Sequence, residues 1–131
     1  MRPKLDLMES ENEVDMSITI KSYIRNSGLG PAIFVSGVIT FRGKVYHCSR
    51  EGDMRLLVEA SMPKDVQYEL TRHETKSPGF MMIMREEHCL AEVVLLGVTG
   101  DDLRAFKEAK KEMKIEVVYR SLYDEEFRMT E

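Results

Sequence analysis

Hydrophobic and polar residues alternate from Ile18 onward. Ile18, Ile20 and Ile24 fall on one side of an extended chain, and mostly polar residues fall on the other. This period of two predicts a half-buried strand. A turn-forming segment at residues 26–31 (NSGLGP) separates it from a second predicted strand, Ala32–Phe41.

A tight hairpin is predicted after the second strand. Gly43–Lys44 suits a two-residue turn with glycine at its first central position, where φ is positive. Phe41 then lies beside Tyr46. With either two-residue turn, Tyr46 faces the same side of the sheet as Ile39, toward the expected core. Apolar residues alternate again at Met54–Ala60, which predicts the third main strand of an antiparallel meander.

Residues 62–73 fit both helical spacing and alternation. Pro63 near their start favours a helix, because proline suits the first helical position. The apolar runs Phe80–Met84 and Leu90–Val98 are typical of strands covered on both faces.

The clearest helix signal follows Thr99. Asp102 lies three residues on, in an arrangement that resembles a capping box, and acidic residues favour a helix amino terminus. Residues 114–123 then return as a strand.

These elements predict the α+β class. We expect an antiparallel sheet of about six or seven strands that begins as a meander, with one or two helices packed on one face. Residues 16–123 form a single domain in this interpretation. Residues 1–15 and 124–131 lack a sustained period, which predicts a flexible acidic N-terminal tail and an acidic C-terminal tail.

Charge is distributed unevenly along the chain. The net charge is -4, yet residues 17–55 hold six basic and two acidic side chains, whereas residues 56–131 hold eleven basic and sixteen acidic ones. A local basic surface on an acidic body can meet an anionic ligand or an acidic partner. No apolar run approaches the ~20 residues that span a bilayer, so we expect a cytoplasmic protein without membrane association.

Two His-Cys dipeptides, His47-Cys48 and His88-Cys89, are candidates for chemistry. Two imidazoles and two thiols would suit tetrahedral zinc, but adjacent residues of a strand face opposite sides of the sheet. A nucleophilic pair of Cys48 with His88 lacks the helix start or neighbouring cation that activates a thiol. We therefore predict no metal ion, no cofactor and no catalytic residue, with both cysteines reduced in the cytoplasm.

Lys21, Tyr23 and Arg25 share one face of the first predicted strand, and Arg42 lies in the hairpin. Cations with an aromatic ring can hold phosphates and stack on unpaired bases, so these four residues are the candidate anionic contact. The Gly28-Leu29-Gly30 segment has no helix after it and is interpreted as a turn, since a phosphate loop leads into a helix.

Met81, Met82 and Met84 form the densest part of a methionine-rich chain. At a sheet edge they could contact a second copy, which predicts a homodimer. The sequence thus favours a small non-catalytic binding or accessory domain that self-associates. The alternatives are a protein that binds RNA or single-stranded DNA, and an enzyme whose site is assembled from distant residues.

Overall fold

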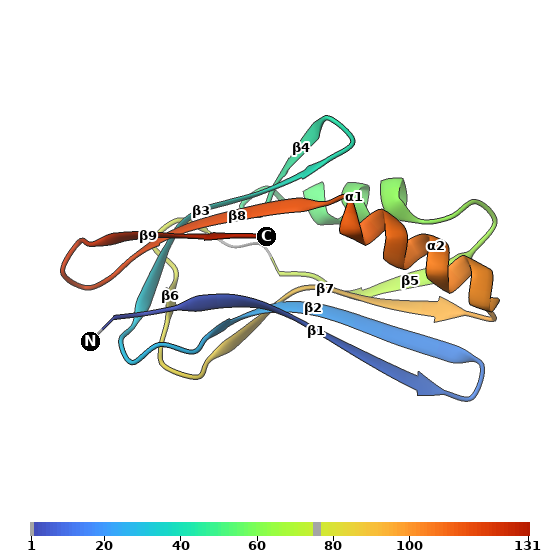
Figure 1. Cartoon of the computed structure of the whole chain (residues 1–131), viewed down its shortest axis with the longest axis horizontal. Coiled ribbons are helices and arrows are strands. Elements are labelled where there is room, and N and C mark those ends of the chain that lie inside the picture. Colours follow the sequence, from blue (N-terminus) through green and yellow to red (C-terminus); the bar gives the residue numbers. More distant parts are fainter. Residues whose placement is uncertain (1, 75–76) are drawn as a thin grey trace.

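Two antiparallel sheets and two helices make up the structure, a computed structural model that describes residues 2–74 and 77–131 (Figure 1). Sheet A has the strand order β1 (Leu5–Val14), β2 (Ser17–Asn26), β7 (Glu87–Leu96) and β5 (Gln67–Arg72). Sheet B has the order β4 (Lys44–His47), β3 (Ala32–Phe41), β8 (Lys114–Arg120) and β9 (Glu126–Thr130), and β6 (Met81–Met82) pairs with β3. The predicted α+β class is confirmed.

The helices α1 (Asp53–Ser61) and α2 (Gly100–Lys111) lie between the sheets toward the end of the molecule that holds the β1–β2 turn (Figure 1). Phe106 of α2 and Val58 of α1 pack on the inner face of sheet A. The helices therefore hold the two sheets apart at this end, whereas the sheets contact each other directly at the other end. Among the described residues no helix is long and apolar enough to cross a bilayer.

Buried side chains form two separate clusters. The inter-sheet cluster joins sheets A and B with α1 and with Ala109 of α2. Its other members include Ile24, Phe34, Ile39, Leu57, Leu90, Ile115 and Val117. The helix-side cluster joins sheet A to the helices and consists of Ile18, Ile20, Val58, Val93, Leu95 and Phe106. The buried core of the described chain is therefore divided into two parts.

Both predicted tails contain paired strands. β1 is hydrogen-bonded to β2 from Leu5 to Val14, and β9 is paired with β8. β1 is an edge strand with charged residues at inward-facing positions, so its sequence shows little apolar alternation beyond Leu5 and Leu7. These strands raise the number of strands to nine in the described chain.

The segment Met54–Ala60 lies in helix α1, where the sequence pattern predicts a strand. Met54, Leu57, Val58 and Ser61 are the buried residues, which is helical spacing, while Leu56 is exposed. The reverse difference occurs in residues 62–73. The sequence favours a helix there, whereas the structure has strand β5. In both segments the apolar residues fit both periods, and the tertiary contacts select one.

The hairpin turn is Arg42–Gly43, one residue earlier than predicted. Phe41 pairs with Lys44, and Arg42 and Gly43 have φ of 49° and 80°, as a primed two-residue turn requires. Tyr46 is opposite Ile39 and is buried, so its predicted orientation is confirmed.

The predicted start of α2 is confirmed as well. The Thr99 side chain accepts a hydrogen bond from the backbone N–H of Asp102 at 3.1 Å. This cap helps to set the position from which α2 crosses sheet A.

Candidate functional site

A cavity of about 490 Å³ separates the two hydrophobic clusters. Its apolar lining comes from both sheets and both helices and consists of Leu7, Met8, Ile20, Ile39, Met54, Leu57, Val58, Leu90, Ala91, Val93, Phe106, Met113 and Ile115. The volume falls within the range of roughly 300–1,000 Å³ that is usual for small-molecule sites. The cavity is therefore the candidate functional site.

Charged residues of β1 and α2 form the mouth of the cavity. Residues directly opposite each other in a sheet share a face, and Glu9 and Glu11 lie opposite Ser22 and Ile20, so both carboxylates point to the inner side. Lys107 and Lys110 stand one turn apart on α2 and form ion pairs with Glu11 and Glu9. These two ion pairs link the edge of sheet A to the helix.

Lys110 makes the most contacts at the mouth. Its Nζ atom donates to the Glu9 carboxylate and, at 3.1 Å, to Ser22 Oγ, and it lies 5.9 Å from the centroid of the Phe106 ring. The Lys107–Glu11 pair is separated by 2.7 Å. An apolar interior with ammonium groups at its entrance can hold a molecule that has an apolar part and an anionic part.

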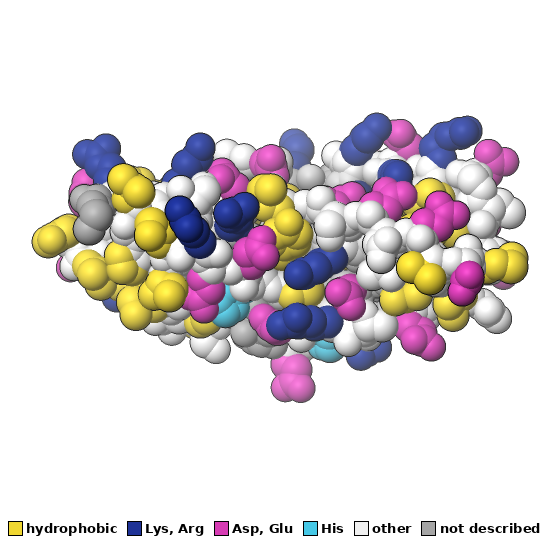
Figure 2. All heavy atoms as spheres, turned by 90° about the horizontal axis from the view of Figure 1, so that it is seen from below, with side chains coloured by type: hydrophobic (Ala, Val, Ile, Leu, Met, Phe, Trp, Pro, Cys, Tyr) yellow, Lys and Arg dark blue, Asp and Glu magenta, His cyan; other side chains and the backbone are white. Residues whose placement is uncertain are grey.

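The predicted basic face lies elsewhere, on the outer side of sheet A. Lys21, Tyr23 and Arg25 share this face, with the Lys21 Nζ atom 4.8 Å from the centroid of the Tyr23 ring. Lys21 is opposite Glu92, and Arg25 is opposite both Asp6 and Glu87. Figure 2 shows this face, where blue and magenta side chains are interleaved. Acidic strands thus offset the positive charge that is concentrated in the sequence.

Arg42 does not join the other three candidate residues. It lies in the β3–β4 turn of sheet B, where its guanidinium pairs with the Glu112 carboxylate at 2.8 Å. The four residues predicted as one anionic contact therefore occupy two sheets.

The three methionines also divide. Met82 is buried in the inter-sheet cluster, whereas the Met81 and Met84 side chains are exposed. The β6 strand is two residues long and pairs with Ala32 and Ile33 of β3. Two of the three candidate self-contact residues are accessible.

The two cysteines occupy different parts of the molecule. Cys48 packs in the inter-sheet cluster beside Gly37, while Cys89 is opposite Tyr23 on the outer side of sheet A. Burial raises the pKa of the Cys89 thiol above its ordinary value. Among the described residues no three His, Cys, Asp or Glu side chains are grouped so that they could hold a metal ion.

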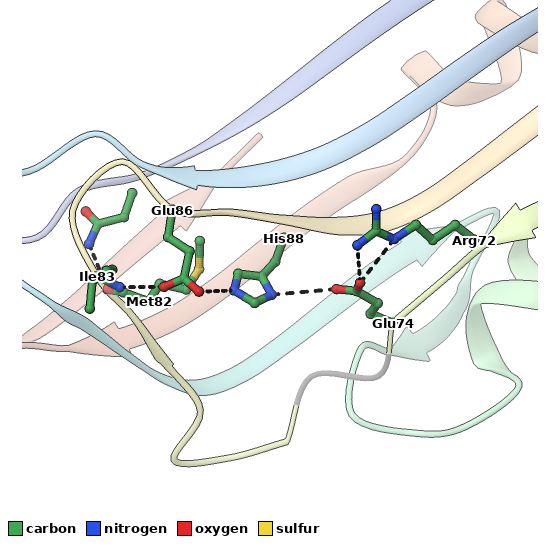
Figure 3. Close-up of polar contacts among 7 residues, drawn as sticks. Arg72, Glu74, Met82, Ile83, Glu86 and His88 are labelled. Atoms are coloured by element: carbon green, nitrogen blue, oxygen red, sulfur yellow. Dashed lines mark hydrogen bonds and ion pairs between the residues drawn. The ribbon is translucent and has the colours of Figure 1, made fainter.

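A polar network around His88 connects three segments of the chain (Figure 3). His88 Nε2 lies 3.0 Å from Glu86 Oε1, and His88 Nδ1 lies 3.6 Å from Glu74 Oε2, which belongs to a carboxylate that also pairs with Arg72. Hydrogen bonds from the Ile83 N–H and from His88 lower the pKa of the Glu86 carboxyl. The network fastens the chain after β5 and the turn after β6 to sheet A, away from the cavity lining.

Sequence patterns missed the residues at the mouth. Lys107 and Lys110 have the spacing of one helical face, but Glu9 and Glu11 lie in a segment that resembles a tail. The spacing of two between Glu9 and Glu11 is the signal that the sequence offers, because it puts both on one face of a strand. It indicates a site only when β1 is known to lie at the edge of sheet A.

Comparisons with known proteins add little to this description. No protein-family model matches the chain, and no curated protein matches its sequence. A solved structure described as a crystal structure of a protein from Archaeoglobus fulgidus is similar over 98% of this chain and 92% of that chain, with 14% sequence identity and a TM-score of 0.27. A likeness at this level supports no statement about function, which is therefore inferred from the cavity.

Proposed function

We propose that this protein is a non-catalytic binding protein of the cytoplasm that holds a small apolar molecule in the cavity between its sheets. The observation that carries the proposal is the apolar cavity that divides the core into two clusters. Its lining gains dispersion contacts, and the ligand loses area exposed to water, when an apolar molecule enters.

The polar groups of the cavity lining favour binding over bond-making. Ser61 Oγ donates to the Val58 carbonyl at 2.9 Å, and Ser22 Oγ accepts from Lys110. Both glutamates at the mouth are paired with lysines. These polar groups thus hold the walls together and are placed to orient a ligand.

Replacing Ala91 with phenylalanine is expected to weaken binding of the neutral fluorescent probe Nile red by about tenfold, on the order of 1.4 kcal/mol. Ala91 lies on β7 and lines the cavity, so the added ring occupies the space that the probe needs. Fluorescence titration measures the dissociation constant, and urea unfolding shows whether the variant is folded.

The matched control is Ala105→Phe, on the exposed side of α2 and outside the cavity lining. It is expected to bind Nile red as the wild type does. No binding by the wild-type protein, or equal binding by a folded Ala91→Phe variant, would contradict the proposal.

A second candidate property, self-association, is favoured by exposed apolar side chains at one end of the molecule. They come from β6 and from the β2–β3, β6–β7 and β8–β9 connections, and they are 46–80% exposed. We call this surface the end patch, and its members are Leu29, Met81, Ile83, Met84, Leu122 and Tyr123. Figure 2 shows hydrophobic side chains gathered at its left end, where these connections lie. Contiguous exposed apolar surface is typical of interaction sites.

A second copy of this chain is the occupant that the charges around the end patch favour. The ion pairs Arg2–Glu125 and Arg120–Asp124 border it, so both signs of charge are present beside one apolar surface. A twofold contact places the same surface on both partners and therefore needs both signs in each copy.

Light scattering across a dilution series is expected to show a dimer for the wild type and a monomer for Ile83→Glu, because a carboxylate in a dimer interface is costly to bury. Leu56→Glu, at an exposed position of α1, should remain dimeric. A wild-type monomer at every concentration would disprove self-association.

A further inference from the structure

We infer that the ligand of the cavity is an amphipathic carboxylate, whose apolar tail lies among the core side chains and whose head group replaces the Glu9 carboxylate on Lys110. The inference rests on the proposed function and specifies the class of ligand.

The mouth of the cavity already binds a carboxylate. The Lys110 side chain is only 18% exposed, and its ammonium group at the edge of an apolar lining is stabilised by charged or strongly polar partners. The chain supplies two such partners, the Glu9 carboxylate and Ser22 Oγ. A ligand carboxylate has the same charge and shape as the Glu9 head group, so it can make the same contacts.

Glu9 is the partner that can leave. Its side chain is 47% exposed and lies on the edge strand β1, so its carboxylate can turn into water without crossing the core. Lys107 lies one helical turn away and keeps a second positive charge near the mouth. The exchange conserves the number of ion pairs at Lys110, so the apolar tail supplies most of the affinity and the head group supplies selectivity.

The side chains at the mouth also define where the head group stops. Phe106 lies beneath the Lys110 ammonium and belongs to the helix-side cluster, so the lining becomes apolar immediately inside the ion pair. An amphipathic molecule would cross this boundary with its carboxylate outermost. A molecule that lacks the charge could still enter but would leave the Lys110–Glu9 pair intact.

Matched probes separate the tail from the head group. We expect cis-parinaric acid to bind more tightly than its methyl ester, and the difference to shrink with added salt because the contact is ionic. Lys110→Met keeps an apolar stem and removes the charge. It is expected to weaken binding of the acid by about five- to tenfold and to change binding of the ester by less than about twofold. The loss for the acid is the size expected for an ordinary hydrogen bond, because the head group must also displace Glu9 from the ammonium group.

Removing the competing carboxylate should have the opposite effect. Glu9→Gln is expected to tighten binding of the acid by about threefold, because glutamine competes less well for the ammonium group, and to leave the ester unaffected. A purely structural role for the Lys110–Glu9 pair predicts no such gain. Glu13→Gln on the same strand and Lys114→Met at the start of β8 are the controls, since both residues are exposed and lie outside the cavity lining.

The outcomes separate the inference from the proposed function. Equal binding of acid and ester by the wild type, or weaker binding of the acid by Glu9→Gln, overturns the inference while the cavity remains a ligand site. Failure of both probes to bind the wild type removes the proposed function with it. If Lys110→Met does not fold, the Glu9→Gln variant, which keeps the ammonium group, decides the question.

Discussion

Replacing Asn26 with alanine is expected to lower the free energy of unfolding by about 3–4 kcal/mol, because several buried hydrogen bonds are lost together. The Asn26 side chain is fully buried at the end of β2. Its Nδ2 atom donates to the Gly30 and Met82 carbonyls at 2.9 and 3.0 Å, and its Oδ1 atom accepts from the Lys4 and Gly28 N–H groups at 3.2 and 3.1 Å. Alanine leaves these four backbone groups without their partner.

Urea unfolding of wild type and variant measures the change. Asn26→Asp keeps the size of the side chain but replaces the two donors with an oxygen that faces two carbonyls, so it should also be strongly destabilising. Asn12→Ala, at an exposed position of β1, should change the stability by less than about 0.5 kcal/mol. A loss below about 1 kcal/mol for Asn26→Ala would show that Asn26 is not the junction that the contacts describe.

Gly28→Ala should be destabilising by about 3 kcal/mol, at the upper end of the cost of overpacking. A Cβ atom at position 28 would lie 2.4 Å from both the Arg2 carbonyl oxygen and the Lys4 nitrogen. These are backbone atoms, held by hydrogen bonds from the Ser27 N–H to the Lys4 carbonyl and from the Leu29 N–H to the Arg2 carbonyl. The methyl group can fit only if the chain before β1 moves away.

Gly100→Ala is the matched control for this substitution. Gly100 begins α2, and a Cβ atom there meets no atom within 4 Å. Alanine favours the helix, so this variant should be stabilised by up to about 1 kcal/mol. Opposite signs for the two variants in urea unfolding are the expected result, and a neutral Gly28→Ala would contradict the close packing of the two segments.

Both predictions concern how the start of β1 is fastened to the β2–β3 connection. The same strand carries Leu7 and Glu9 into the cavity lining. Loosening its start therefore loosens one wall of the ligand site, so stability and binding are expected to be linked through β1.

Local patterns were sufficient for several elements. The alternation of apolar and polar residues predicts β2, and the apolar run predicts β7. In both strands the pattern along the chain follows from which faces of sheet A are covered. The cap at Thr99 depends on residues three positions apart, so the start of α2 can also be predicted from the sequence. The orientation of Tyr46 follows from the length of one hairpin turn.

Elements that depend on partners far away in the sequence could not be predicted from local patterns. β1 is polar because its inward-facing glutamates meet lysines of α2, which lie about one hundred residues further along the chain, and such a strand resembles a tail. α1 and β5 have apolar residues that satisfy two periods, and their packing against other elements selects one. The cavity has no sequence signature, since its lining comes from seven elements and resembles an ordinary core.

The amino-acid sequence by itself determined the α+β class, the period and exposed face of individual strands, and the start of α2. The tertiary structure decided how the strands divide into two sheets, and with it the cavity and the meeting of Glu9 with Lys110. The physical reason is that a period of two specifies which residues of a strand share a face, whereas the neighbour of that strand depends on contacts between residues far apart in the chain.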